Sequence, residues 1–179
     1  MNPKSKRVLR IGLTIFVALL LVFWLFGAWY KSTYSMKVAT SREVNDPGLA
    51  LKVLIATQGS EFKDNVVSRV ISKLESRPIY IKVIDVSGLS DVKVSEWASI
   101  VIIHTWEMGE PPKPVADFIK ANNARDLIVL ATSGDGNYHI DGVDGITSAS
   151  KLDDTDRCVH EILNRIEFKI APEEISNFN

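Results

Sequence analysis

The chain is poor in the residues that build disulfide frameworks and metal centres. Its 179 residues include one cysteine and three histidines. A single cysteine, Cys158, excludes an intramolecular disulfide and a cysteine-based metal cluster, and in a helical segment we expect it to be a small buried residue. His104, His139 and His160 do not have the spacing of a histidine metal site. These residue types therefore predict no metal site.

Acidic residues are absent from the first part of the chain. Residues 1–42 carry seven of the 21 Lys/Arg, whereas all 22 Asp/Glu lie from Glu43 onward. The net charge of −1 thus combines a basic N-terminal part with an acidic remainder. An acidic domain does not attract a nucleic-acid backbone, so no nucleic-acid binding is expected. The acidity is compatible with a basic protein partner, or it only maintains solubility.

One uninterrupted apolar run follows the basic segment 1–10. Residues 11–30, IGLTIFVALLLVFWLFGAWY, contain no charged side chain. A helix of this length reaches across a hydrocarbon core of about 30 Å. Trp24, Trp29 and Tyr30 suit the lipid–water boundary at its far end. We therefore expect one transmembrane helix at 11–30 that anchors the chain in a lipid bilayer.

The flanks of this run predict its orientation. Four basic residues precede it, while Lys31, Lys37 and Arg42 follow it. This bias favours a cytoplasmic N-terminus and an extracytoplasmic soluble domain, with a cytoplasmic soluble domain as the alternative. A cleaved signal peptide is the competing interpretation, but its apolar region usually has about 7–15 residues. Because the run is longer and Gly27-Ala28-Trp29 is a poor cleavage site, an uncleaved signal anchor is favoured.

The remaining chain divides into a tether, one domain and a tail. Residues 31–49 lack a sustained apolar period and end in the turn signal Asn45-Asp46-Pro47-Gly48, so we expect a tether. Residues 50–170 are enough for one domain with a single core. Residues 171–179 are expected to form a disordered tail.

Short apolar runs alternate with helical periods inside 50–170. Runs rich in Val and Ile predict strands buried on both faces, and they occupy 51–56, 79–86, 99–104, 127–131 and 145–147. Helical apolar stripes are formed by Val66, Val67, Val70, Ile71 and Leu74, by Val115, Phe118 and Ile119, and by Val159, Ile162, Leu163 and Ile166. The alternation predicts an α/β three-layer sandwich with a mostly parallel sheet of about five strands.

Ligands of such sheets bind at the carboxyl ends of the strands, near the point where the strand order reverses. Three loops follow strands there. Their candidate binding residues are Thr57, Gln58, Gly59 and Ser60, then Thr105, Trp106 and Glu107, then Ser133, Gly134 and Tyr138. No catalytic residue is assigned, because Ser60 and Ser133 lack the surroundings of a nucleophile elbow.

Two further sequence patterns suggest alternative sites, a proton-transfer pair and a calcium loop. His104 and Glu107 are close enough in sequence to form a proton-transfer pair, although a strand-end histidine is more often structural. Oxygen-bearing side chains alternate in Asp135, Asn137, His139, Asp141 and Asp144. That spacing is similar to a calcium loop, but Ile140 stands where such a loop requires glycine, so a Gly/Asp turn is favoured.

Over residues 50–168 the chain resembles the flavodoxin-like family. Val53–Ser60 resembles the phosphate loop, Val101–Trp106 with Pro111-Pro112 the third strand and isoalloxazine loop, and Leu127–Gly136 the fourth strand and flavin-edge loop. The resemblance implies FMN as cofactor and electron transfer to or from a protein partner, as an FMN-dependent oxidoreductase if the chain is an enzyme. Trp106 or Tyr138 would then stack on the flavin ring.

The chain departs from the family pattern in two places. The family's phosphate loop has the form Ser/Thr-x-Thr-Gly-x-Thr, and in Ala56–Glu61 only Gly59 matches cleanly. Glu61 repels a phosphate, which Lys63 can offset. About ten residues separate the fourth strand from Val143, which leaves no room for the usual fourth helix. An alternative function is therefore a cofactor-free binding or assembly module of a membrane complex.

Overall fold

The structure is a computed structural model of the whole chain. The residues it describes are 3–34, 36–107, 109–138, 140 and 142–176. Two compact units divide the chain, Met1–Ser35 and Met36–Asn179. The first unit consists of helix α1 and the second contains all the strands.

Helix α1 (Pro3–Tyr34) includes the whole predicted span 11–30 and extends beyond it at both ends. Its stretch Arg10–Trp29 has a mean hydropathy of 2.6, and none of it is buried. By length and composition this is one helix that can cross a membrane. A signal sequence near an N-terminus can have the same length and apolar composition.

The second unit is built on a seven-stranded sheet in the order β2-β4-β3-β5-β6-β7, with β1 paired to β3. The strands are β1 (Lys37–Val38), β2 (Arg42–Val44), β3 (Leu51–Gly59), β4 (Ile79–Asp85), β5 (Ser99–Thr105), β6 (Leu127–Thr132) and β7 (Asp144–Ser148). β4, β3, β5, β6 and β7 are parallel. Their order is the 2-1-3-4-5 order of doubly wound flavodoxin-like sheets, with the switch point between β3 and β5.

The predicted fold class is confirmed, and the predicted strand count is corrected from five to seven. The two additional strands, β1 and β2, pair antiparallel with β3 and β4. Both lie in the stretch 31–49 that we interpreted as a tether. Strands of two and three residues are too short to show an alternating pattern, and their side chains are largely exposed.

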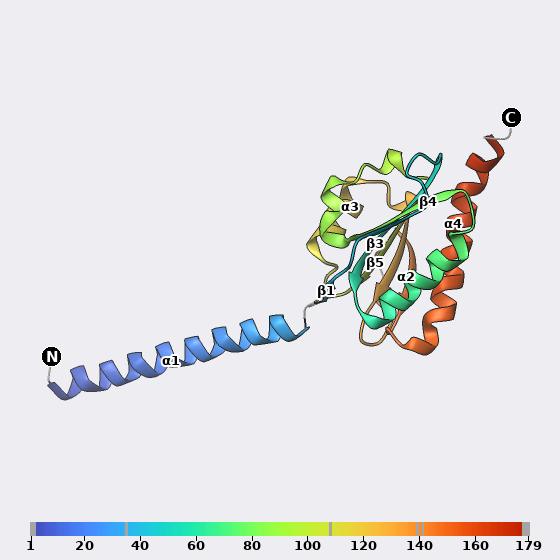
Figure 1. Ribbon diagram of the computed structural model, residues 1–179. Helices are drawn as coiled ribbons and strands as arrows, with labels where there is room; N and C mark the ends of the chain where they lie inside the picture. Colours follow the sequence, from blue (N-terminus) through green and yellow to red (C-terminus); the bar gives the residue numbers. More distant parts are fainter. Residues whose placement is uncertain (1–2, 35, 108, 139, 141, 177–179) are drawn as a thin grey trace. The chain divides into compact units, whose positions relative to one another are not determined.

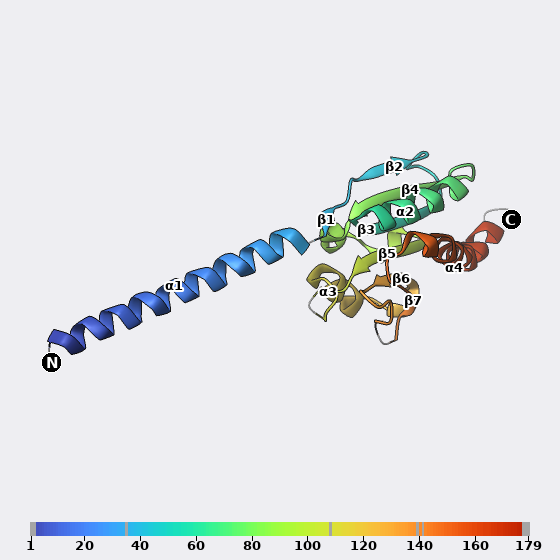
Figure 2. The same ribbon diagram turned by 90° about the horizontal axis from the view of Figure 1, so that it is seen from below.

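Helices cover both faces of the sheet (Figures 1 and 2). Helices α2 (Glu61–Leu74) and α4 (Thr155–Ser176) contact each other and pack on one face, while α3 (Lys113–Ala121) and the 3₁₀ helix η1 (Val86–Asp91) pack on the other. The remaining 3₁₀ helices are η2 (Val94–Glu96), η3 (Ala124–Asp126) and η4 (Leu152–Asp154). Helix α4 continues to Ser176, into the range 171–179 assigned above to a tail.

Alternate residues of β3 face two different apolar cores. Val53 and Ile55 pack with the buried stripe of α2 and with α4. Leu54 and Ala56 pack with η1 and α3. All four are nearly inaccessible to solvent, so both faces of this central strand are covered, as the apolar runs predict.

The crossover between β6 and β7 contains no helix among its described residues, in agreement with its short length. Gly136 in this loop has a φ of 76°. A Cβ atom there would lie 2.8 Å from the Ala149 backbone nitrogen. Only glycine therefore lets this loop pack against the segment that follows β7.

Candidate functional site

The first candidate loop is mostly an extended strand. β3 continues to Gly59, and Ser60 alone separates it from α2. β1 pairs with this end of β3, with Lys37 opposite Gly59 and Val38 opposite Gln58. A Cβ atom on Gly59 would lie 3.0 Å from the Lys37 carbonyl oxygen, so the close approach of β1 needs glycine. The open backbone loop that the resemblance implies is not present here.

A buried lysine lies at the start of α2, on the side of the sheet covered by α2 and α4. Lys63 is 1% exposed. Its Nζ lies 2.6 Å from Thr105 Oγ1, 3.4 Å from Ser60 Oγ and 3.4 Å from Met36 Sδ. Among the described residues no carboxylate forms an ion pair with this ammonium group, although the charges of Asp64 and Glu107 act on it from a distance. The site therefore holds a cation whose charge is not neutralised locally.

Burial lowers the pKa of Lys63 to about 8 because the charged form loses its hydration. An ammonium group without an anionic partner is costly to keep in a protein interior. A bound anion next to Nζ would remove most of that cost and would raise the pKa again.

Hydroxyl groups continue from Lys63 across the ends of two strands. Thr105 Oγ1 lies 2.7 Å from Thr132 Oγ1, and the Thr132 hydroxyl donates to the His104 carbonyl oxygen at 3.2 Å. With Thr132 donating to the carbonyl, Thr105 donates to Thr132 and accepts from Lys63. This series of hydrogen bonds fixes the direction of the Thr105 lone pair that accepts the hydrogen bond from the Lys63 ammonium group.

A cleft of about 410 Å³ opens over this lysine. It is lined by Met36, Ser60, Glu61, Phe62, Lys63, Thr105, Ser133, Gly134, Ala149, Ser150 and Leu152. Four candidate residues from three different loops, Ser60, Thr105, Ser133 and Gly134, therefore meet in one cleft. Its volume is in the usual range for small-molecule sites.

The other candidate residues lie outside this cleft. Gln58 Oε1 accepts a hydrogen bond from the Thr105 backbone N–H at 2.7 Å, and Gln58 Nε2 donates to Glu107 Oε1 at 3.0 Å. Gln58 thus joins the end of β3 to the loop after β5. Thr57 and Gly59 line a different hollow beneath β1.

The two candidate stacking residues contact each other. The rings of Trp106 and Tyr138 are 5.4 Å apart, and those of His104 and Trp106 are 6.2 Å apart. His104 is fully buried, and burial lowers its pKa to about 4, so the imidazole is neutral at physiological pH. Because Glu107 bonds Gln58, the structure gives no support to a His104–Glu107 proton-transfer pair.

No group of three potential metal ligands occurs among the residues that the structure describes. His139 and Asp141, two members of the calcium-like pattern, lie outside the described residues. Asp135 accepts hydrogen bonds from Ser133 and from the Asn137 backbone, as in a turn.

Two residues of the cleft are not among the candidate binding residues that the sequence predicts. In the sequence Lys63 is only a charge that offsets Glu61, and Met36 lies in the predicted tether. A signal for Lys63 is its place on the apolar face of α2, in line with Val67 and Val70 at spacings of i+4 and i+7. A lysine on such a face is either paired or functional.

The burial of Lys63 predicts a pH dependence of stability. The pKa is 10.5 for an unperturbed lysine and about 8 in the folded chain. Between these values the unfolded chain keeps a proton that the folded chain has lost, so the free energy of unfolding rises with pH. We expect an increase of about 1–3 kcal/mol from pH 8 to pH 10 in the ligand-free protein. Denaturant titrations at several pH values measure it, and an equal rise in Lys63→Met would contradict this assignment.

The chain was compared with known proteins at three levels. No protein-family model matches it, and no curated protein matches it. Solved structures do match. A flavodoxin from the domain Archaea shares 15% identity at a TM-score of 0.45, with 66% of this chain and 99% of that chain covered.

A second structural match is the metal-soaked Flv1 flavodiiron core from Synechocystis sp. PCC6803. It shares 14% identity at a TM-score of 0.46, and the match covers 67% of this chain and 37% of that chain. The flavodoxin-like fold of the second unit follows from the order and direction of its five parallel strands.

Proposed function

We propose that the chain is a membrane-anchored flavodoxin-like protein that binds FMN over Lys63 and exchanges electrons with a protein partner. The observation that carries this proposal is the buried Lys63 ammonium group at the carboxyl edge of the sheet, which has no carboxylate partner among the residues that the structure describes. α1 supplies the anchor, and the charge bias of its flanks favours a cytoplasmic N-terminus and an extracytoplasmic domain.

The residues fit the phosphate of FMN by charge and by hydrogen bonding. Lys63 supplies the cation, and the hydroxyls of Ser60 and Thr105 are already within hydrogen-bond reach of its Nζ. The N-terminus of α2 adds a favourable dipole at the same place. The backbone cradle of the family is replaced by strand pairing with β1. Side chains, rather than a backbone loop, would therefore hold the phosphate.

Neighbouring loops offer surfaces for the flavin ring. Trp106 and Tyr138 provide aromatic faces on the loops after β5 and β6. The neutral His104 adds no charge beside them. When bound, FMN supplies the capacity to accept and donate electrons. The chain's own residues would bind the phosphate and orient the ring.

A titration with FMN tests this proposal. The full chain, purified in detergent, is expected to quench flavin fluorescence and to shift the visible absorption spectrum. The same protein without added FMN is the reference. Absence of both changes at several hundred micromolar FMN would contradict the proposal.

Glu61 is expected to weaken binding because its carboxylate lines the cleft beside the phosphate site. Replacing Glu61 with threonine removes a negative charge and adds a hydroxyl donor, so FMN affinity should rise about three- to tenfold. Stability should fall by a few tenths of a kcal/mol, because an acid in the first turn of a helix is favourable. Glu75→Thr, at the other end of α2, is the matched control. Unchanged affinity in Glu61→Thr would place the phosphate elsewhere.

Two observations favour a second function, that of a cofactor-free binding or assembly module. β1 occupies the end of β3 where the family has its open loop, and Trp106 and Tyr138 contact each other. The strand pairing uses backbone groups of β3, and the ring contact covers part of the two aromatic faces, that a ligand would otherwise meet. The FMN titration separates the two functions, because this module would leave the flavin spectrum unchanged.

A further inference from the structure

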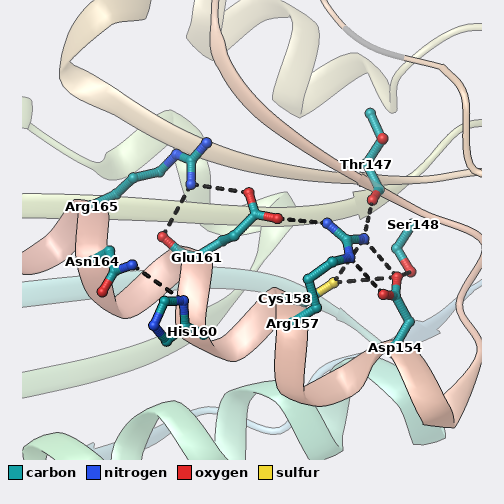
Figure 3. A network of polar contacts seen from close by, with 9 residues as sticks. All are labelled: Thr147, Ser148, Asp154, Arg157, Cys158, His160, Glu161, Asn164 and Arg165. Carbon is teal, nitrogen blue, oxygen red and sulfur yellow. Dashed lines mark hydrogen bonds and ion pairs between the residues drawn. The ribbon is translucent and has the colours of Figure 1, made fainter.

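A dense polar network joins the start of α4 to the end of β7 (Figure 3). Arg157 binds Asp154 through two nitrogens, Nε to Oδ1 at 2.6 Å and Nη2 to Oδ2 at 2.7 Å. The same guanidinium donates to the Thr147 carbonyl oxygen and to Glu161 Oε1, each at 2.7 Å. A planar fork with five donors is suited to hold these groups together, and a lysine, with one nitrogen, could hold only some of them.

The network fixes the turn that follows β7. The Ser148 hydroxyl donates to Asp154 Oδ2 at 2.7 Å, and the Ser150 backbone N–H donates to Ser148 Oγ at 3.2 Å. Ser150 has a φ of 57°, in the left-handed region that serine rarely adopts. Such backbone strain persists only where surrounding contacts enforce it, and it is frequent at ligand sites.

This strained turn forms one wall of the cleft over Lys63. Ala149 and Ser150 line it together with Ser60 and Lys63. Ser150 is exposed, and its hydroxyl forms no hydrogen bond within the described part of the chain. Ser150, with this free hydroxyl, therefore lines the same cleft as the Lys63 ammonium group.

We propose that Asp154 and Arg157 form a clamp that positions Ser150 to bind the phosphate group of the ligand held by Lys63. The clamp residues act through the turn and do not touch the ligand, so they are positioning residues. This inference rests on the proposed function. Ser150, which follows the strand predicted at 145–147 and was not among the candidate binding residues, then becomes a phosphate ligand with Lys63 and Ser60.

The chain contains its own reporter for the clamp. Cys158, the only cysteine, is fully buried, and its Sγ lies 3.7 Å from both Asp154 Oδ2 and Arg157 Nη2. Burial raises its pKa to about 11, so the thiol is unreactive at neutral pH. Opening of the clamp should expose it to a thiol reagent.

The test compares FMN and riboflavin binding in variants of the full chain. Arg157→Gln should lower FMN affinity about tenfold and leave riboflavin affinity unchanged, because only FMN carries the phosphate. Cys158 should react faster with a disulfide reagent in this variant, and Arg157→Lys should be intermediate. Arg69→Gln, which removes an exposed ion pair between Arg69 and Asp156, is the matched control and should match the wild type in both measurements.

Ser150→Gly separates the hydroxyl from the clamp. Glycine tolerates a positive φ, so the fold and the protection of Cys158 should persist, while FMN affinity should fall about tenfold. Wild-type FMN affinity in Arg157→Gln or in Ser150→Gly would overturn the inference while the proposed function stands. Absence of FMN binding by the wild type would overturn the proposed function and the ligand role of Ser150 together.

Discussion

Replacing Lys63 with methionine is expected to strengthen the fold and to weaken FMN binding. Methionine fills a similar volume without a charge, so the ligand-free protein should gain about 1–3 kcal/mol in its free energy of unfolding. The phosphate loses a charge-assisted hydrogen bond worth about 1.5–3 kcal/mol, which corresponds to about a 10- to 150-fold weaker affinity. Denaturant titration and flavin fluorescence measure the two effects.

A rise in stability together with a fall in FMN affinity distinguishes a binding residue from a structural one. Lys113, whose side chain is 84% exposed and pairs with Asp117, provides the control. Lys113→Met should change stability and affinity little. If Lys63→Met unfolds more easily than the wild type, the buried ammonium stabilises the fold by itself, and the argument for an anionic ligand is lost.

Two arginines in the middle of the apolar run are expected to release the chain from the membrane. Leu19→Arg with Leu20→Arg adds about 6–8 kcal/mol to the cost of insertion. Both positions lie at the centre of the stretch Arg10–Trp29. Fractionation with an alkaline carbonate wash should find the wild type in the membrane pellet and the double variant outside it.

A conservative change at the same positions controls for the substitutions themselves. Leu19→Ile with Leu20→Ile keeps the run apolar and should remain in the pellet. A double arginine variant that stays in the pellet would contradict the anchor. A mature chain that starts after residue 30, measured by mass spectrometry, would instead show a cleaved signal peptide. A cytoplasm-dependent reporter fused after Asn179 tests the orientation, because its activity would contradict an extracytoplasmic domain.

The main elements of the fold could be read from the sequence because both faces of the sheet are covered. Strands such as 99–104 and 127–131 are continuous apolar runs, and they coincide closely with β5 and β6. The stripe from Val66 to Leu74 matches the buried face of α2. Burial requires apolar residues along each of these segments, in continuous runs for the strands and in a stripe for the helix, and both patterns are visible in the sequence.

The contacts of the site could not be read in the same way. Lys63 reaches Thr105 across 42 residues, and Met36 meets Lys63 across 27, so only tertiary packing brings them together. β1 shows no alternating apolar pattern in the sequence because it consists of only two residues, and both are exposed. The turn at Ser150 depends on Asp154 and Arg157 through a network that no local motif indicates.

The affinity ratio between FMN and riboflavin, measured with the full chain at pH 7, tests the central claim most directly. Both ligands carry the same ring, and only FMN carries the phosphate that Lys63 is proposed to hold. We expect FMN to bind at least about tenfold more tightly, and raising the pH above 8 should reduce this preference as Lys63 loses its proton. Equal affinities for the two ligands, or a preference that does not change with pH, would contradict the account.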